Sequence, residues 1–247
     1  MDFYALIIGT EILNKRREDK HFKFLSSELA KYGHTLKASL VIYDDPDLIT
    51  STLNWLNSLP NAVIFCFGGI GSTPDDYTRQ AAATALRDGI LYINEEAKKI
   101  IVDTLGKRAY PYAINMANLP KDCKLLENHF NKMPGFSLDD KFFFMPGFPE
   151  MSHQMVLDIL SKLDIKKRKV YRHTLTAMCR ESDLIPIMET MPRNVEMSSL
   201  PKLYSDGPRV TISVASTDKS AALENFKKFT DELQKKEIIY ALNDEKE

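Results

Sequence analysis

AVIFCFGGIGSTPDDYTRQAAATALR, residues 62–87, is the stretch that decides the fold. It opens with six apolar residues, 62–67, which are rich in β-branched and aromatic side chains and end at glycine, so they predict a short buried strand. Residues 73–76, Thr-Pro-Asp-Asp, carry the signals of a helix start: a capping threonine, a proline at the first helical position and an acid three residues after the cap. Between strand and helix lie Gly68, Gly69 and Gly71.

A glycine turn that joins a strand to a capped helix directs backbone N–H groups and the helix dipole toward an anion. Glycine also lets a ligand come close to the main chain. Asp75 and Asp76 in the first helical turn would repel a bare phosphate, but Mg²⁺ binds a few carboxylates together with substrate phosphates. The stretch therefore predicts a Mg-phosphate or Mg-diphosphate site. The alternative is a tight turn in which the two acids only cap the helix.

Composition indicates a soluble globular protein of 247 residues, either one large domain or a domain of about 150–170 residues plus a smaller one. The net charge is −1, which does not favour nucleic acid or an anionic membrane as a partner. No apolar run approaches the length of a membrane span, and the N-terminus has no basic signal-peptide region. Three widely spaced cysteines favour the reducing cytoplasm: Cys66, Cys123 and Cys179.

The first 87 residues predict a β-α-β-α-β-α order, with strands at 3–8, 36–43 and 62–67 and helices at 19–32 and from 46. This order implies a parallel sheet with helices on both faces, in which ligands bind at the carboxyl ends of the strands. Those ends carry glycine and acidic residues. We expect them to converge on one edge: Gly9, Thr10 and Glu11; Asp44 and Asp45; and Gly68 to Asp76.

The middle of the chain predicts a helix at 94–105, a loop at 118–126, an apolar strand at 142–145 and a helix at 150–163. The Pro-Gly pairs near 134 and 146 are either plain chain reversals or further parts of the site. After a charged boundary at 164–169, a small α+β unit is predicted, with no G-x-x-G loop and no basic stripe typical of RNA binding. Its elements are strands at 170–177, 195–204 and 209–215 and helices at 181–191 and 219–236, with a disordered tail at 243–247.

These residues resemble the CinA-type (competence/damage-inducible) branch of the MogA/MoaB molybdopterin-binding family. The family's G-G-x-G-x-T-x-D-D-x-T-x-x-A signature matches residues 68–81, which is a long and specific match. Shorter motifs match as well: I-G-x-E-[IL]-L at 8–13, D-D-P-x-x-[IL] at 44–49, the P-G-F elements at 133–136 and 145–149, and the E-S-x-[IL] helix start of the small domain at 181–184.

The resemblance covers the chain to about residue 236 and implies an α/β fold. The expected first domain, residues 1–165, is a MoaB/Mog-like domain with three α/β/α layers and a mostly parallel sheet. The expected second domain, residues 170–240, is a smaller CinA-type α+β domain, and the deamidase domain of full-length CinA proteins is expected to be absent. The resemblance also implies a homo-oligomer, with a dimer favoured over the trimers and hexamers of Mog-type relatives.

For function, the resemblance implies phosphoanhydride chemistry on a nucleotide or pterin, with Mg²⁺ or another divalent metal. The leading expectation is metal-dependent hydrolysis of the ADP-ribose diphosphate linkage; the alternative is adenylyl transfer to molybdopterin from ATP. The expected catalytic residues are Asp75 and Asp76, which are also the expected metal ligands, and Asp45. The expected substrate-binding residues are Gly9, Glu11, Gly68, Gly69, Gly71, Ser72, Thr73, Gly135, Pro146 and Gly147.

Two segments depart from the family pattern. After Pro149 the chain continues directly with Glu150 and Met151, one residue shorter than the usual P-S-E-M. Where the family has G-x-x-x-D-x-N, residues 15–21 read KRREDKH, so that only Asp19 is kept and His21 stands at the asparagine position. His21 could still supply the hydrogen bond expected of asparagine. The departure also motivates a third hypothesis of a different class, a non-catalytic nucleotide- or pterin-binding protein.

Overall fold

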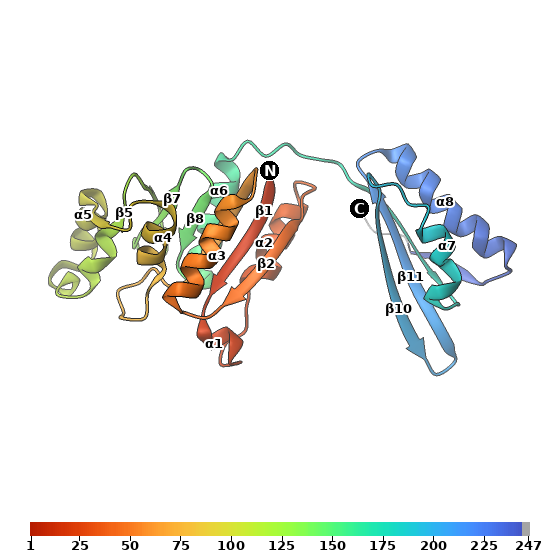
Figure 1. Cartoon of the computed structure of the whole chain (residues 1–247), viewed down its shortest axis with the longest axis horizontal. Coiled ribbons are helices and arrows are strands. Elements are labelled where there is room, and N and C mark those ends of the chain that lie inside the picture. The colour runs from red at the N-terminus through yellow and green to blue at the C-terminus, as the bar shows by residue number, and fades with distance from the viewer. Residues whose placement is uncertain (244–247) are drawn as a thin grey trace. The chain divides into compact units, whose positions relative to one another are not determined.

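The computed structural model describes residues 1–243 and divides into two compact units, Met1–Lys167 and Arg168–Glu247. Figure 1 shows the ribbons of both units. Of the tail predicted to be disordered, only Asn243 lies within the described residues, where it ends a strand. Among residues 1–243, no helix combines the length and the apolar character needed to cross a membrane.

The first unit is built on a six-stranded sheet with strand order β2-β1-β3-β8-β7-β6. The first four of these strands run parallel, and β7 and β6 extend the sheet in antiparallel fashion. The expected mostly parallel sheet is therefore confirmed. The strands are β1 (Asp2–Ile8), β2 (Leu36–Ile42), β3 (Ala62–Phe67), β6 (Lys124–Leu126), β7 (Gly135–Leu138) and β8 (Phe142–Met145); β4 (Leu91–Ile93) and β5 (Asn118–Pro120) form a separate pair.

Helices cover both faces of this sheet, because its strands are apolar on both sides (Figure 1). Alternate residues such as Leu6 and Cys66 pack toward α3, α4 and α5, whereas their neighbours Ile7 and Phe65 pack toward α2 and α6. This arrangement gives three α/β/α layers, as predicted. The helices are α1 (Thr10–Leu13), α2 (His21–Ala30), α3 (Pro46–Ser58), α4 (Thr78–Leu86), α5 (Glu95–Leu105), α6 (Pro149–Lys162) and the 3-10 helices η1 (Gly106–Ala109) and η2 (Ala113–Ala117).

The structure corrects the prediction at residues 118–126 and contains one strand, β7, that the sequence did not predict. Residues 118–126, expected to be a loop, contain β5 and β6. The Pro-Gly turn near 134 leads into β7, whose backbone pairs with β6 on one side and β8 on the other. Such pairing depends on partners distant in sequence, which the local residues do not reveal.

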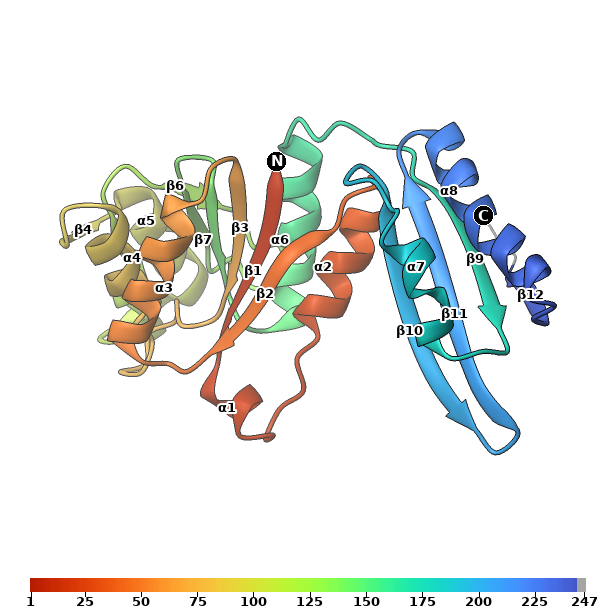
Figure 2. The ribbon, with the colours of Figure 1, turned by 45° about the vertical axis from the view of Figure 1, so that its right-hand side comes forward.

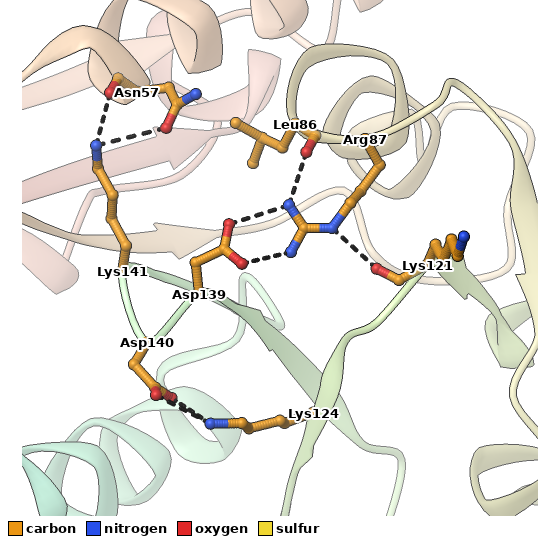
Figure 3. A network of polar contacts seen from close by, with 8 residues as sticks. All are labelled: Asn57, Leu86, Arg87, Lys121, Lys124, Asp139, Asp140 and Lys141. Carbon is orange, nitrogen blue, oxygen red and sulfur yellow. Dashed lines mark hydrogen bonds and ion pairs between the residues drawn. The ribbon is translucent and has the colours of Figure 1, made fainter.

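A polar network fastens the hairpin between β7 and β8, as Figure 3 shows. Its turn residues Asp139 and Asp140 both have positive φ, 57° and 49°, and the N–H of Lys141 donates to the carbonyl of Leu138 at 3.0 Å. The Arg87 guanidinium, at the end of α4, donates to both carboxylate oxygens of Asp139 at 2.7 and 3.0 Å. This bidentate contact connects the end of α4 to a turn that lies 52 residues further along the chain.

We expect Arg87→Ala to lower the free energy of unfolding of the first unit by about 1–2 kcal/mol, since a bidentate pair is stronger than a single exposed contact. The substitution also removes the donor to the carbonyl of Lys121 at 3.0 Å. Urea unfolding measures the change. The matched control is Lys98→Ala, which removes a single ion pair at 3.3 Å with the exposed carboxylate of Glu95; equal losses in the two variants would contradict the prediction.

The second unit is a four-stranded antiparallel sheet, order β10-β11-β9-β12, with α8 beside it (Figure 2). Its core joins the sheet to α8 through buried Phe226, Phe229 and Leu233. The helix expected at 181–191 is shorter and has a 3-10 first turn. The bounds are β9 (Tyr171–Ala177), η3 (Glu181–Leu184), α7 (Ile185–Met188), β10 (Glu196–Tyr204), β11 (Gly207–Ser216), α8 (Lys219–Lys235) and β12 (Tyr240–Asn243).

Candidate functional site

The carboxyl ends of the four parallel strands of the first unit surround one pocket of about 590 Å³. This volume is typical of small-molecule sites. The residues that follow β1, β2, β3 and β8 line it together with a segment near 131–134, so the structure brings together the corners that the sequence predicted to converge. The lining residues are Ile8, Glu11, Arg17, Asp44, Gly68, Gly69, Ile70, Gly71, Ser72, Thr73, Asp75, Asp76, Met116, Asn131, Met133, Pro134, Pro146, Gly147, Phe148 and Met151.

The loop after β3 forms one wall and offers backbone donors. Gly68 and Gly69 have φ of +101° and +67°, and a Cβ on either would overlap Ile8 or Thr78, so only glycine fits both positions. Across the described part of the chain, no hydrogen bond uses the N–H groups of residues 69–72. Four consecutive free amides on a pocket wall are suited to phosphate oxygens.

The expected helix start at Thr73 is wrong, because α4 begins only at Thr78. The predicted contact between Thr73 and Asp76 does form: the N–H and the hydroxyl of Thr73 donate to Oδ2 of Asp76 at 2.8 and 2.6 Å. It closes a separate turn instead of capping a helix. The helix is delayed because Thr78 is held back against the glycine loop, where its N–H donates to the carbonyl of Gly69 at 3.0 Å and its hydroxyl to that of Gly68 at 3.0 Å.

Of the two adjacent aspartates after β2, Asp44 lines the pocket and Asp45 does not. Asp45 caps α3 by accepting from the N–H of Leu48 at 2.7 Å. Asp44 accepts from the N–H of Thr10 at 2.7 Å and returns a bond from its own N–H to the Thr10 hydroxyl at 3.2 Å. The structure thus places Asp44 where Asp45 was expected, because the helix start occupies the side chain of Asp45.

Four carboxylates line the pocket, those of Glu11, Asp44, Asp75 and Asp76, against one guanidinium, that of Arg17. Nη1 of Arg17 lies 3.5 Å from Oε1 of Glu11, so the two side chains form an ion pair. Within residues 1–243, no three acidic, histidine or cysteine side chains stand close enough to hold a metal by themselves. The donor set nevertheless fits Mg²⁺, which needs only one or two carboxylates when substrate phosphates and water complete its shell.

Buried Arg79 holds the glycine loop in place, a role that the sequence did not reveal. It is 8% exposed, and its guanidinium donates to the carbonyl of Gly71 at 2.7 Å, to that of Asn118 at 3.2 Å and to that of Asn115. Burial lowers the pKa of Arg79, while the nearby Asp76 carboxylate raises it. The only sequence signal was an arginine on the otherwise alanine-rich inner face of α4.

Of the three remaining glycines that were predicted to bind substrate, only Gly147 lines the pocket. Gly147 lines the pocket and packs closely on the loop after β3, since a Cβ there would lie 3.3 Å from the Cα of Gly68. Gly9 does not line the pocket and lies two residues before the lining residue Glu11. Gly135 is buried within β7, where a Cβ would collide with the carbonyl of Phe144; its neighbours Met133 and Pro134 line the pocket instead.

His21 does not line the pocket, but it contacts the backbone of the lining residue Gly147. Its Nε2 lies 3.1 Å from the carbonyl of Gly147, and its ring stacks on Phe67 with centroids 4.2 Å apart. Only 2% of the residue is exposed. Burial lowers the pKa of His21 to about 4, so the ring is neutral at pH 7 and Nε2–H donates to Gly147.

Acid should therefore destabilise the first unit through His21. A pKa of about 4 in the folded state, below the ordinary 6.5, means that its contribution is fully present above pH 6.5 and is lost as the pH falls toward 4. The loss is at most about 1.4 kcal/mol per pH unit. Urea unfolding between these two pH values should show a steeper fall in stability for the wild type than for His21→Asn, which keeps a donor but does not titrate. Parallel curves would count against this assignment.

Comparisons with known proteins agree with this architecture. The sequence model of a protein family described as "Probable molybdopterin binding domain" matches residues 4–165. A crystal structure titled as the protein CinA with unknown function, from Thermoplasma acidophilum, superposes with a TM-score of 0.59 at 25% identity, covering 65% of this chain and 96% of that chain.

Two relatives show how the similarity extends along the chain. A CinA-like protein of Desulforapulum autotrophicum is 30% identical over 64% of this chain, which spans 38% of that relative's length. A protein of Thermococcus kodakarensis is 29% identical over 80% of this chain and 84% of its own length. The similarity to the second relative thus reaches beyond the pocket-bearing unit.

Proposed function

Because the chain belongs to the molybdopterin-binding domain family, in its CinA-like branch, we propose that its pocket binds a nucleotide or pterin diphosphate with Mg²⁺ and hydrolyses the diphosphate linkage. The observation that carries the proposal is the presence of four free backbone amides and four carboxylates in the lining of one cavity. Amides without a cation suit a simple anion, and carboxylates without amides suit a simple cation. Together they suit a phosphoanhydride with its counter-ion.

Each group has a part in this chemistry. The amides of residues 69–72 bind phosphate oxygens, and Arg79 keeps that loop in position through the carbonyl of Gly71. Asp75 and Asp76 are the residues that would hold Mg²⁺, which supplies charge neutralisation at the phosphates when bound. The carboxylate of Asp76 keeps Oδ1 free while Oδ2 accepts from Thr73, so Oδ1 would either complete the Mg²⁺ shell beside Asp75 or accept a proton from the attacking water.

ADP-ribose is the first substrate to test. Hydrolysis adds one water across the diphosphate and yields AMP and ribose 5-phosphate, which chromatography separates. We expect both products in equal amounts when Mg²⁺ is present and neither in excess EDTA. Stable ADP-ribose with Mg²⁺ would remove the hydrolase proposal for this substrate.

The family description favours one alternative, adenylyl transfer to molybdopterin, since it names molybdopterin as the ligand. ATP would then lose pyrophosphate as AMP is joined to the pterin phosphate. Pyrophosphate release from ATP that requires molybdopterin supports this reaction over hydrolysis. Tight binding without turnover of either substrate supports the third hypothesis, a binding protein, which the altered segment at 15–21 motivates.

A further inference from the structure

One group of neighbouring residues in the pocket lining is chemically unlike the glycine-rich and acidic wall. It is apolar and rich in thioethers, with a single neutral amide. Asn131 contacts Met133 and Met151, and the N–H of Met151 donates to the carbonyl of Phe148. Polarizable sulfur and aromatic side chains pack well against a flat ring. The residues of this group, called the apolar end below, are Asn131, Met133, Pro134, Phe148 and Met151.

The amide of Asn131 has a fixed orientation. Its Oδ1 accepts from the backbone N–H of Met133 at 3.0 Å and from Nδ2 of Asn128 at 2.8 Å. Because a backbone N–H can only donate, the atom facing Met133 must be the oxygen. The two hydrogens of Nδ2 therefore point elsewhere.

The Nδ2 of Asn131 has a poor partner in this structure. It lies 3.6 Å from the thioether sulfur of Met151, which is a weak acceptor. Both residues line the pocket. A ring nitrogen or carbonyl oxygen of a bound ligand would be a much stronger acceptor for the same hydrogens.

The ring of Phe148 is open to a ligand at the same end. The residue is 54% exposed although it lines the pocket. The guanidinium of Arg17 covers one side of the ring, 4.8 Å from its centroid, and Arg17 is itself fixed by Glu11. An exposed aromatic side chain held in this way is a stacking surface for a flat heterocycle.

We propose that Asn131 and Phe148 determine ligand specificity by binding a planar nitrogen heterocycle, adenine or pterin, at the apolar end. The heterocycle stacks on Phe148, and Nδ2 of Asn131 donates to an acceptor on its edge. This inference rests on the proposed function, because it places the phosphates of the same ligand at the loop of residues 69–72.

The test compares ligands with and without the heterocycle. Calorimetry with Mg²⁺ measures the affinity of the full chain for AMP and for ribose 5-phosphate, which carries the same phosphate without a base. Asn131→Asp keeps the oxygen that Met133 needs but replaces the donor by an acceptor. We expect the ratio of AMP affinity to ribose 5-phosphate affinity to fall about tenfold, the effect of losing one hydrogen bond of ordinary strength.

Phe148→Ala is the second variant, and since the side chain is exposed its loss should not affect folding. We expect about a tenfold fall in AMP affinity, in keeping with the loss of one stacked base. Phe130→Ala, which removes an exposed phenylalanine outside the pocket, is the matched control and should bind AMP as the wild type does. Adenosine and neopterin, which lack phosphate, show which heterocycle the apolar end prefers.

The outcomes separate this inference from the proposed function. If the wild type binds AMP and both variants bind it equally well, or if AMP binds no better than ribose 5-phosphate, the inference is overturned while the phosphate site stands. If the wild type binds none of these ligands, the proposed function fails and the inference fails with it.

Discussion

Asp76→Ala is expected to slow ADP-ribose hydrolysis by about 10²–10⁴-fold, the range lost when a positioned proton acceptor is removed. The reason is the position of Asp76: it lines the pocket, it has one carboxylate oxygen free, and it lies beside the loop of free amides. Initial rates of AMP release at saturating ADP-ribose with Mg²⁺ give the ratio. Asp47→Ala, an exposed acid on α3 away from the pocket, is the control and should hydrolyse as the wild type does.

Asp76→Asn distinguishes chemistry from loop structure. Asparagine keeps an oxygen that can accept from the N–H and hydroxyl of Thr73, so the turn between them can persist. It has no charge for Mg²⁺ and cannot accept a proton, so we expect a loss as large as that of Asp76→Ala. Hydrolysis close to the wild-type rate in Asp76→Asn would show that the residue serves only to shape the loop.

Arg79→Met is expected to cost about 3–5 kcal/mol of unfolding free energy, the order expected when three backbone carbonyls lose a buried, charged donor. The substitution leaves the carbonyls of Gly71, Asn115 and Asn118 without their donor and removes the positive charge beside Asp76. Methionine retains much of the length of the side chain, so the loss reflects the hydrogen bonds more than a cavity. Urea unfolding followed in the first unit measures it.

Arg108→Met provides the matched control, since Arg108 is exposed on η1. It should change stability by less than about 0.5 kcal/mol. A similar small change in Arg79→Met would mean that the glycine loop does not depend on the buried guanidinium. If the loop does depend on it, Arg79→Met should also bind phosphate ligands more weakly, even under conditions where it remains folded.

The sequence predicted the layers of the first unit well because its strands and helices carry strong periodic signals. Buried β3 and the capped start of α3 at Asp45 follow directly from local residues. The pocket could be placed because parallel strands put their carboxyl ends on one edge, wherever they occur in the chain.

What the sequence could not supply depends on contacts between distant residues. Thr73 and Asp76 have the pattern of a helix cap, but Thr78 is held by the glycine loop, so that the same pair closes a turn. Asp44 and Asp45 are chemically identical; Asp45 caps α3, and the bond from Thr10, distant in sequence, holds Asp44 at the pocket. Asn131 gave no signal, since its meaning lies in neighbours brought together by folding.

The central claim is that the loop of free amides and the carboxylates of the same pocket bind a diphosphate through a shared cation. The affinity of the protein for inorganic pyrophosphate, measured by calorimetry with Mg²⁺ and again in EDTA, tests it most directly. Since four carboxylates face one guanidinium, the account predicts binding at least about tenfold tighter with Mg²⁺, an effect of about 1.4 kcal/mol or more. Affinity that is equal or greater in EDTA would contradict it.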